Sequence, residues 1–259
     1  MRKSFKAGAL TAPLPPVLVT VGDFDCANII TIGWTGILST VPPRTYISVR
    51  PERYSYKLLR ERREFVINLA SVPLAWAVDY AGIYTGAKVD KFKECGFTKT
   101  PSREVSAPTI AECPVALECR VVEIIPMGTH DVFVADIVSV SCDESIIDAE
   151  GRMCFDRADL LAYAHGEYFS LGEKVGVFGF STKTPKGKRY TPKSTEPKRK
   201  GSVPTAKKSS ANPPERTKGS KRVSSTPTKL GQSEIESRAE GHKPFYVDIA
   251  KKKNRGRRK

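Results

Sequence analysis

The hydrophobic and polar positions of the first 180 residues predict a mainly β chain. Short runs rich in β-branched residues, such as Val17 to Val21, end at turn residues such as Gly22. From Val115 to Ile125 apolar and polar residues alternate, with the period of a half-buried strand. His130 to Cys142 is more continuously apolar, which predicts a strand covered on both faces. The expected strands are 17–21, 28–34, 45–49, 64–69, 115–125 and 130–142.

Short helices are expected to interrupt these strands. Ser55 is a candidate N-cap for the first helix, and Ser71 followed by Pro73 marks the start of the second. The expected helices are 56–63, 71–81 and 89–95, and a glycine follows each of the last two. The connections between strands are too short for the crossovers of a parallel sheet. An antiparallel barrel is therefore favoured.

The composition changes at residue 181. From there to the end the chain holds 24 Lys and Arg against 6 Asp and Glu, a net of +18, and aromatic residues almost vanish. The first 180 residues hold 19 basic and 22 acidic residues, a net of −3. A segment rich in Lys, Arg, Pro and Ser cannot bury enough apolar surface to offset the entropy of ordering it. We therefore expect one domain over 1–180 and a disordered basic tail over 181–259.

The cysteines and histidines do not suggest a metal site. The six cysteines form no Cys-x-x-Cys pair, and the three histidines lack the spacing of zinc ligands. No apolar run approaches the ~20 residues that span a bilayer, and prolines soon interrupt the apolar residues after the basic start. We expect a cytoplasmic protein without bound metal or membrane contact.

Polar groups occupy particular places in the apolar, strand-like stretch from Asn28 to Ser55. Amide, hydroxyl and guanidinium groups are costly in a plain core, so they indicate a polar ligand. Arg50, Arg53 and Ser55 suit a phosphate, because guanidinium groups match phosphate oxygens and a helix N-terminus favours anions. The other polar or aromatic candidates in this stretch are Asn28, Thr31, Trp34, Ser39 and Thr40.

This stretch resembles the flavin reductase-like, FMN-binding split-barrel family, in which a strand carrying Asn-x-x-Thr leads through Trp and a Pro-Pro turn to Arg and Ser. Four later segments support the resemblance by their order and spacing, namely 66–71 (VINLAS), 85–92 (TGAKVDKF), 128–131 (GTHD) and 163–166 (YAHG). The resemblance implies a Greek-key, antiparallel split β-barrel with short helices. It also implies a homodimer with FMN near the subunit interface.

The resemblance further implies which residues contact FMN. They are Asn28, Thr31, Trp34, Ser39, Thr40, Arg50, Arg53, Ser55, Asn68, Ser71 and Lys91. Several have structural alternatives: Trp34 equally suits a barrel core or dimer interface, Ser39 and Thr40 suit an ordinary turn, and Ser71 suits a helix cap. Asn28 and Thr31 are three apart, so a regular strand would point them to opposite faces.

Two histidines are candidates for the substrate side of the flavin. His130 in a turn between two strands ranks first as the catalytic proton donor or hydrogen-bond partner, with His165 behind it. A lone histidine also often has only a structural role. Lys88 stands where the family carries Arg, so its part in binding stays open.

The expected function is an FMN-dependent oxidoreductase. Bound FMN carries the hydride chemistry, which explains why no nucleophile and base pair is needed. Electrons would come from NAD(P)H or a protein donor and pass to free flavin, a ferric complex or a redox protein. One alternative is a non-enzymatic FMN-binding carrier or sensor. The other is a nucleic-acid-associated protein that uses the basic clusters at 198–200 and 251–259 for nonspecific binding.

Overall fold

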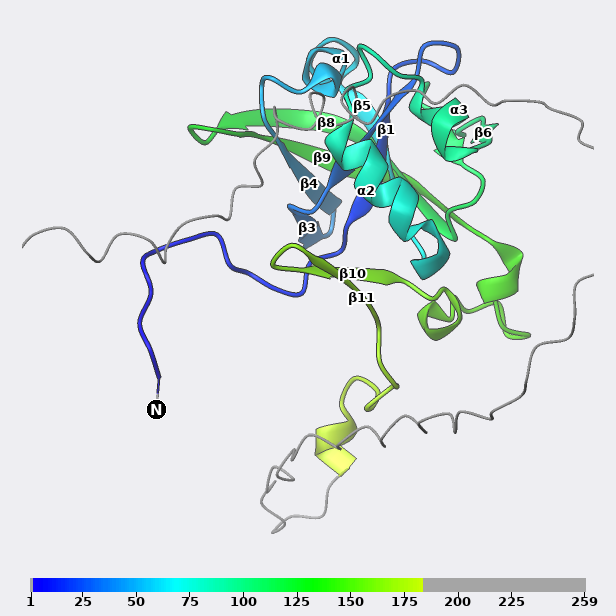
Figure 1. Ribbon diagram of the computed structural model, residues 1–259. Helices are drawn as coiled ribbons and strands as arrows, with labels where there is room; N and C mark the ends of the chain where they lie inside the picture. Colours follow the sequence, from blue (N-terminus) through cyan, green and yellow to red (C-terminus); the bar gives the residue numbers. More distant parts are fainter. Residues whose placement is uncertain (1, 184–259) are drawn as a thin grey trace, which may run out of the picture. The chain divides into compact units, whose positions relative to one another are not determined.

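The main element of the fold is a seven-stranded antiparallel sheet in the order β2-β1-β5-β8-β9-β4-β3 (Figure 1). The structure is a computed structural model that describes residues 2–183. The strands of this sheet are β1 (Val17–Val21), β2 (Asn28–Ile32), β3 (Thr35–Thr40), β4 (Pro43–Val49), β5 (Glu64–Leu69), β8 (Val115–Pro126) and β9 (Asp131–Cys142). β2 at one edge also contacts β4, so the sheet curls into a partly open barrel. The expected antiparallel, mainly β architecture is confirmed.

The remaining elements are short. The helices are α1 (Tyr54–Arg62), α2 (Ala75–Ile83), α3 (Lys91–Cys95) and the 3-10 turns η1 (Val72–Leu74), η2 (Glu144–Ile146), η3 (Phe155–Arg157) and η4 (Phe180–Lys183). Two small hairpins complete the described part, β6 (Lys99–Thr100) with β7 (Thr109–Ile110), and β10 (Leu161–Ala164) with β11 (Glu167–Ser170).

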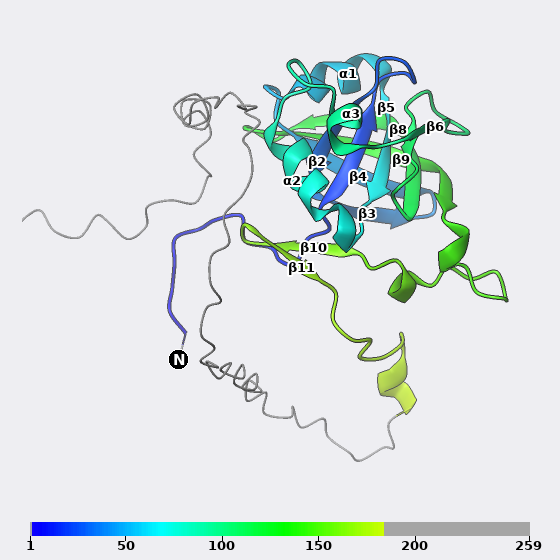
Figure 2. The same ribbon diagram turned by 45° about the vertical axis from the view of Figure 1, so that its right-hand side comes forward.

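Alternating side chains build two cores, one on each face of β1 and β2. Val17 and Val19 point into the barrel, where they join Phe65 and Phe133. Leu18, by contrast, points outward into a second core beneath α2 and α3. Figures 1 and 2 show α2 lying across this side of the sheet. Because both faces are covered, these strands are apolar at nearly every position.

The predicted strands and the observed ones differ at two places. β3 was not expected, because Ser39 and Thr40 were assigned to a turn before the prolines. Instead they end β3 and pair with Arg44 and Pro43, and a proline is tolerated there because it is the first residue of its strand. β9 forms as expected, but Val140 is 49% exposed, so the prediction that both its faces are covered is wrong for its second half.

The predicted N-cap of α1 is also wrong. The helix begins at Tyr54 with Arg53 as its N-cap, and Ser55 lies within the first turn. The Ser55 hydroxyl instead accepts a hydrogen bond of 2.7 Å from the Asn28 amide. α3 ends at Gly96 as predicted, and this glycine has a φ of 67°, a value that favours glycine.

Most of the predicted basic tail, including its clusters at 198–200 and 251–259, lies outside the described residues. Within residues 2–183 no helix is long and apolar enough to cross a bilayer. The same residues contain no group of three or more His, Cys, Asp or Glu side chains placed to hold a metal ion.

Candidate functional site

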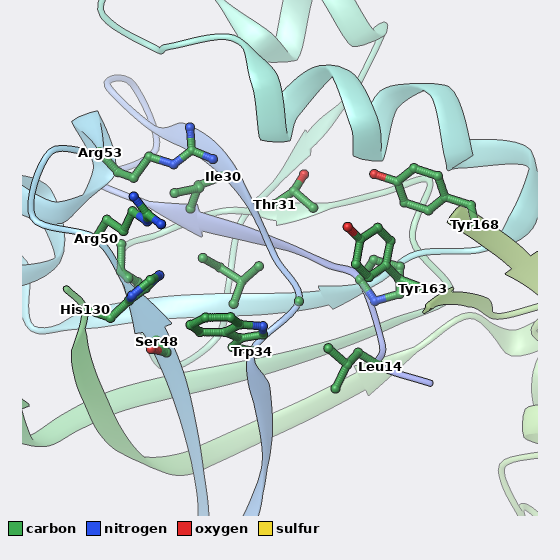
Figure 3. Close-up of a pocket in the computed structure, with 14 residues that line it drawn as sticks. Leu14, Ile30, Thr31, Trp34, Ser48, Arg50, Arg53, His130, Tyr163 and Tyr168 are labelled. Atoms are coloured by element: carbon green, nitrogen blue, oxygen red, sulfur yellow. The ribbon is translucent and has the colours of Figure 1, made fainter. Parts of the chain in front are cut away.

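A pocket opens beside the edge of β2, with a volume of about 280 Å³. Its walls come mainly from four parts of the chain, namely the segment before β1, the second half of β2 with its connection to β3, the end of β4 with the residues that follow it, and the β10–β11 hairpin. The turn before β9 adds one residue, His130. Figure 3 shows cationic side chains at one end of the pocket and two tyrosines at the other. The lining residues are Leu14, Pro16, Ile30, Thr31, Ile32, Gly33, Trp34, Ser48, Val49, Arg50, Arg53, His130, Tyr163 and Tyr168.

Arg50 and Arg53 form the cationic end. They follow β4 directly, so the end of that strand and the N-cap of α1 together fix their positions. Arg53 donates a hydrogen bond of 2.6 Å to the Gly82 carbonyl near the end of α2. Burial, and then the nearby charge of Arg50, lower the pKa of Arg53. An anion bound at this end would relieve that repulsion.

A second polar layer lies behind the cationic end. The buried Asn28 amide donates to Ser55, and Gly86 packs directly against the other side of that amide. Lys91 is only 4% exposed and donates to the carbonyls of Ile29 and Ala81, each at 2.7 Å. Burial first, and then the charge of Arg53, lower the pKa of Lys91 to about 8. Three segments that are distant in sequence therefore converge behind one end of the pocket.

The end of α2 ties this layer together. Its last turns present carbonyl oxygens, to which cations and hydroxyl donors are attracted. Thr31 donates to Val78, Lys91 to Ala81 and Arg53 to Gly82. α2 thus fixes the positions of Lys91 and of two residues that line the pocket, Thr31 and Arg53.

Trp34 and His130 form one wall between the two ends. Their ring centroids lie 4.6 Å apart at an interplanar angle of 38°. The Thr129 hydroxyl lies 3.0 Å from Nδ1 of His130. Burial, followed by the charge of Arg50, lowers the pKa of His130 below its ordinary value of 6.5, while Glu52 acts in the opposite direction. His130 is therefore a neutral imidazole at neutral pH.

Tyr163 and Tyr168 form the opposite end with Leu14. Tyr163 and Leu14 exchange two backbone hydrogen bonds of 2.8 Å each, which hold the segment before β1 against β10. Tyr168 faces Tyr163 across the hairpin, and its hydroxyl donates to Asp79 of α2 at 3.1 Å. Burial first, and then the Asp79 carboxylate, raise the pKa of Tyr168, so this phenol stays protonated.

The structure divides the predicted site residues into three groups. Thr31, Trp34, Arg50, Arg53 and His130 line the pocket. Asn28, Ser55 and Lys91 form the layer behind its cationic end. Ser39, Thr40, Asn68, Ser71 and the second histidine, His165, do not line the pocket of their own chain.

Asn68 is the clearest departure from the expected cofactor contacts. It is fully buried, its amide donates to the Leu18 carbonyl at 3.0 Å, and its side-chain oxygen accepts from the Ile110 amide at 2.9 Å. These bonds join β5 to β1 and to the β6–β7 hairpin. The Asn68 side chain is thus committed to the fold and is not placed to contact a ligand.

Asn28 and Thr31 do point to opposite faces of β2, as their spacing predicts. The neighbour of Asn28 on its own face, Ile30, belongs to the barrel core, whereas Ile29 belongs to the core beneath α2. Thr31 accordingly bonds to α2. Both residues still serve the same site, because the pocket lies at the edge of the barrel, where α1 and α2 approach β2.

The two tyrosines were missed as site residues. Tyr163 belongs to the Tyr-Ala-His-Gly segment, of which only the histidine was a candidate site residue. His165 lies in the turn after β10 with a φ of 51°, so the strand geometry that directs Tyr163 into the pocket ends before it. Leu14 and Tyr168 carried no sequence signal of this kind.

Comparison with known proteins identifies the family. A family model described as "Flavin reductase like domain" matches residues 10–172. The chain belongs to the flavin reductase-like family. The resemblance inferred from the motifs is thereby confirmed, together with the split-barrel fold and a flavin-related redox function.

Solved structures and a characterised relative agree with this assignment. Flavoredoxin of Desulfovibrio vulgaris (Miyazaki F) is 34% identical with a TM-score of 0.66, over 71% of this chain and 100% of that one. The FMN-binding protein from Thermus thermophilus with bound 1-cyclohex-2-enone is 25% identical with a TM-score of 0.58, over 68% of this chain and 99% of that one. An NADPH-flavin oxidoreductase from Streptomyces viridifaciens is 29% identical over 133 residues, which are 50% of this chain and 68% of that protein.

The residues of the pocket fit a flavin. Guanidinium groups at one end suit a phosphate, and the faces of Trp34 and the aliphatic side chains of Ile30 and Ile32 suit a planar ring. The neutral imidazole of His130 lies beside the indole, where it can hydrogen-bond to a ring edge or to a substrate.

Proposed function

We propose that this protein binds FMN in the pocket and passes electrons from NAD(P)H or a protein donor to an acceptor. The observation that carries the proposal is the polarity of the pocket, with two guanidinium groups at one end and an apolar, aromatic remainder. FMN matches this arrangement because it joins a phosphate to a planar ring. The acceptors to be considered are free flavin, a ferric complex, a redox protein, and small conjugated carbonyl compounds like the one bound in the Thermus protein.

The residues have distinct roles in this proposal. Arg50 and Arg53 bind the phosphate, and the buried charge of Lys91 adds to the positive potential behind them. Asn28 and Ser55 hold the start of α1 in place. Trp34 lies against the ring and excludes water, and bound FMN supplies the hydride and electron chemistry.

The test is the absorbance spectrum of the purified full-length protein. The proposal expects a yellow protein whose flavin band bleaches when NADH or NADPH is added without oxygen. Replacement of Arg53 by Gln should weaken FMN binding more than riboflavin binding, because only FMN carries the phosphate. A protein that neither contains nor takes up FMN would refute the proposal.

A non-enzymatic electron carrier is the second candidate, and the likeness to flavoredoxin supports it. In that case the purified protein is yellow, but neither NADH nor NADPH bleaches it. A reduced protein donor then restores the bleaching. The donor screen thus separates a carrier from a reductase.

Nucleic-acid association is a third candidate and rests on the net charge of +18 after residue 180. It predicts salt-sensitive binding of nucleic acid that is lost when the chain is truncated after Phe180, while flavin binding is retained. Binding that survives the truncation would assign it to the domain instead.

We also propose that two copies of the chain form the working unit. β3 is an edge strand of the sheet and exposes Ile37 at 63% and Leu38 at 53%, and Val41 in the following turn is 90% exposed. A second copy covering this surface would bury these side chains near the pocket. Light scattering should give the mass of a dimer for the wild type and the mass of a monomer for Leu38→Asp. Phe5→Asp changes another exposed apolar residue and is the control, which should remain a dimer.

A further inference from the structure

The two tyrosines at the end of the pocket differ in the hydrogen bonds of their hydroxyl groups. The Tyr168 hydroxyl donates to Asp79 at 3.1 Å, so its proton is already committed. The Tyr163 hydroxyl has no hydrogen-bond partner among residues 2–183. Figure 3 shows it directed toward the space beside Thr31, inside the pocket. Of the two phenols, only Tyr163 therefore has a proton free to donate to a ligand.

The position of Tyr163 is well fixed. Its backbone forms two hydrogen bonds with Leu14, and its ring lies 5.3 Å from that of Tyr168 at an angle of 59°. The hydrogen bond from Tyr168 to Asp79 in turn fastens the hairpin to α2. A donor held in this way loses little conformational freedom when a ligand binds.

The surroundings of Tyr163 indicate what kind of ligand it would bind. Leu14 beside Tyr163 is apolar, and Tyr163 and Tyr168 add their aromatic rings, so this end of the pocket favours a hydrocarbon body. The Asp79 carboxylate behind Tyr168 disfavours an anion at this end, and the guanidinium groups lie at the other end. The complementary group is therefore a neutral oxygen acceptor on an apolar ring.

We propose that Tyr163 is a specificity-determining residue, whose hydroxyl donates a hydrogen bond to the carbonyl oxygen of a small, neutral, conjugated acceptor. This inference rests on the proposed function, because it concerns the electron acceptor of the same pocket. It adds a role for a residue of this chain, distinct from the binding of FMN at the cationic end.

The test compares two ligands that differ in one oxygen. Cyclohex-2-enone and cyclohexene are titrated into the full-length protein, and dissociation constants are measured by protein-observed NMR. The wild type should bind the enone more tightly than cyclohexene. In Tyr163→Phe this preference should fall about tenfold, since one hydrogen bond to a poorly hydrated oxygen is lost, while cyclohexene binding stays the same. Tyr84→Phe, which removes a hydroxyl from an exposed tyrosine outside the pocket lining, is the matched control and should keep the preference.

Three results would overturn the inference. They are a wild type without preference for the enone, a Tyr163→Phe variant with an unchanged preference, and a Tyr84→Phe variant that loses the preference as Tyr163→Phe does. The NMR comparison needs no turnover and can be made with or without flavin. FMN uptake is read separately from absorbance, so failure of the proposed function is distinguishable from failure of this inference.

Discussion

Replacement of Gly86 by Ala tests the layer behind the cationic end of the pocket. A Cβ atom built on Gly86 would lie 2.1 Å from Oδ1 of Asn28, 2.6 Å from its Cγ and 2.8 Å from Cδ1 of Tyr54. The φ of Gly86 is not in the left-handed region, so the backbone accepts an alanine and only space is lacking. The Asn28 amide must therefore move, and its buried hydrogen bond to Ser55 is lost.

The expected cost follows from these two effects. Overpacking of a tight site costs about 1–3 kcal/mol. A buried polar group that loses its partner costs about 1–3 kcal/mol more. We expect the free energy of unfolding to fall by about 2–6 kcal/mol, or roughly 4–24 °C in Tm for a domain of this size. FMN affinity should fall as well, because Asn28 and Ser55 hold the start of α1 beside Arg53.

Urea denaturation and flavin titration measure the two effects. Gly172→Ala is the control, because its added Cβ meets nothing within 4 Å, and it should be neutral or slightly stabilising. In an Asn28→Ala background the alanine at position 86 should cost much less, which gives a coupling energy above about 1.5 kcal/mol. A Gly86→Ala protein with wild-type stability and FMN affinity would show that Asn28 does not lie where the structure places it.

Three further predictions concern Lys91 behind the pocket, His130 in its wall and Asn68 away from it. For Lys91, the folded-state pKa of about 8 lies below the unfolded value of 10.5, so the unfolded chain binds more protons between these values. The free energy of unfolding should thus rise with pH over this window, by up to about 3 kcal/mol, and urea denaturation of Lys91→Met should show a flatter pH profile. For His130, NMR titration should give a pKa below 6.5. This pKa should fall further in Glu52→Gln and rise in Arg50→Gln. Equal pKa values in all three proteins would contradict the placement of these charges. Asn68→Ala should lower the free energy of unfolding by about 1–3 kcal/mol but leave the FMN affinity of the folded protein unchanged. A reduced FMN affinity would show that Asn68 contributes to the binding site.

The sequence predicted the strands well where periodicity alone decides burial. β1 and β5 have the predicted bounds, and the expected alternation in β8 places Cys119 and Val121 in the barrel core. β3 was missed because its partner is β4, and pairing at the edge of a sheet leaves a weaker pattern than burial does. Glu118 is one of the polar positions in the alternation of β8, yet it is buried beneath the loop that follows β6, where its carboxylate accepts hydrogen bonds from the backbone amides of Arg103 and Glu104. A single sequence does not show which loop will fold over a strand.

The cationic end of the site was predictable for a local reason. Arg50, Arg53 and Ser55 lie within six residues, so the end of one strand and the start of one helix are enough to bring them together. The tyrosine end depends instead on a hairpin more than a hundred residues away in sequence, held against the segment before β1. What separates Tyr163 from Tyr168 is a single carboxylate on α2, and no local pattern encodes that contact. The family motifs therefore predict the cationic end of the pocket, whereas the tyrosine end depends on tertiary contacts that only the structure supplies.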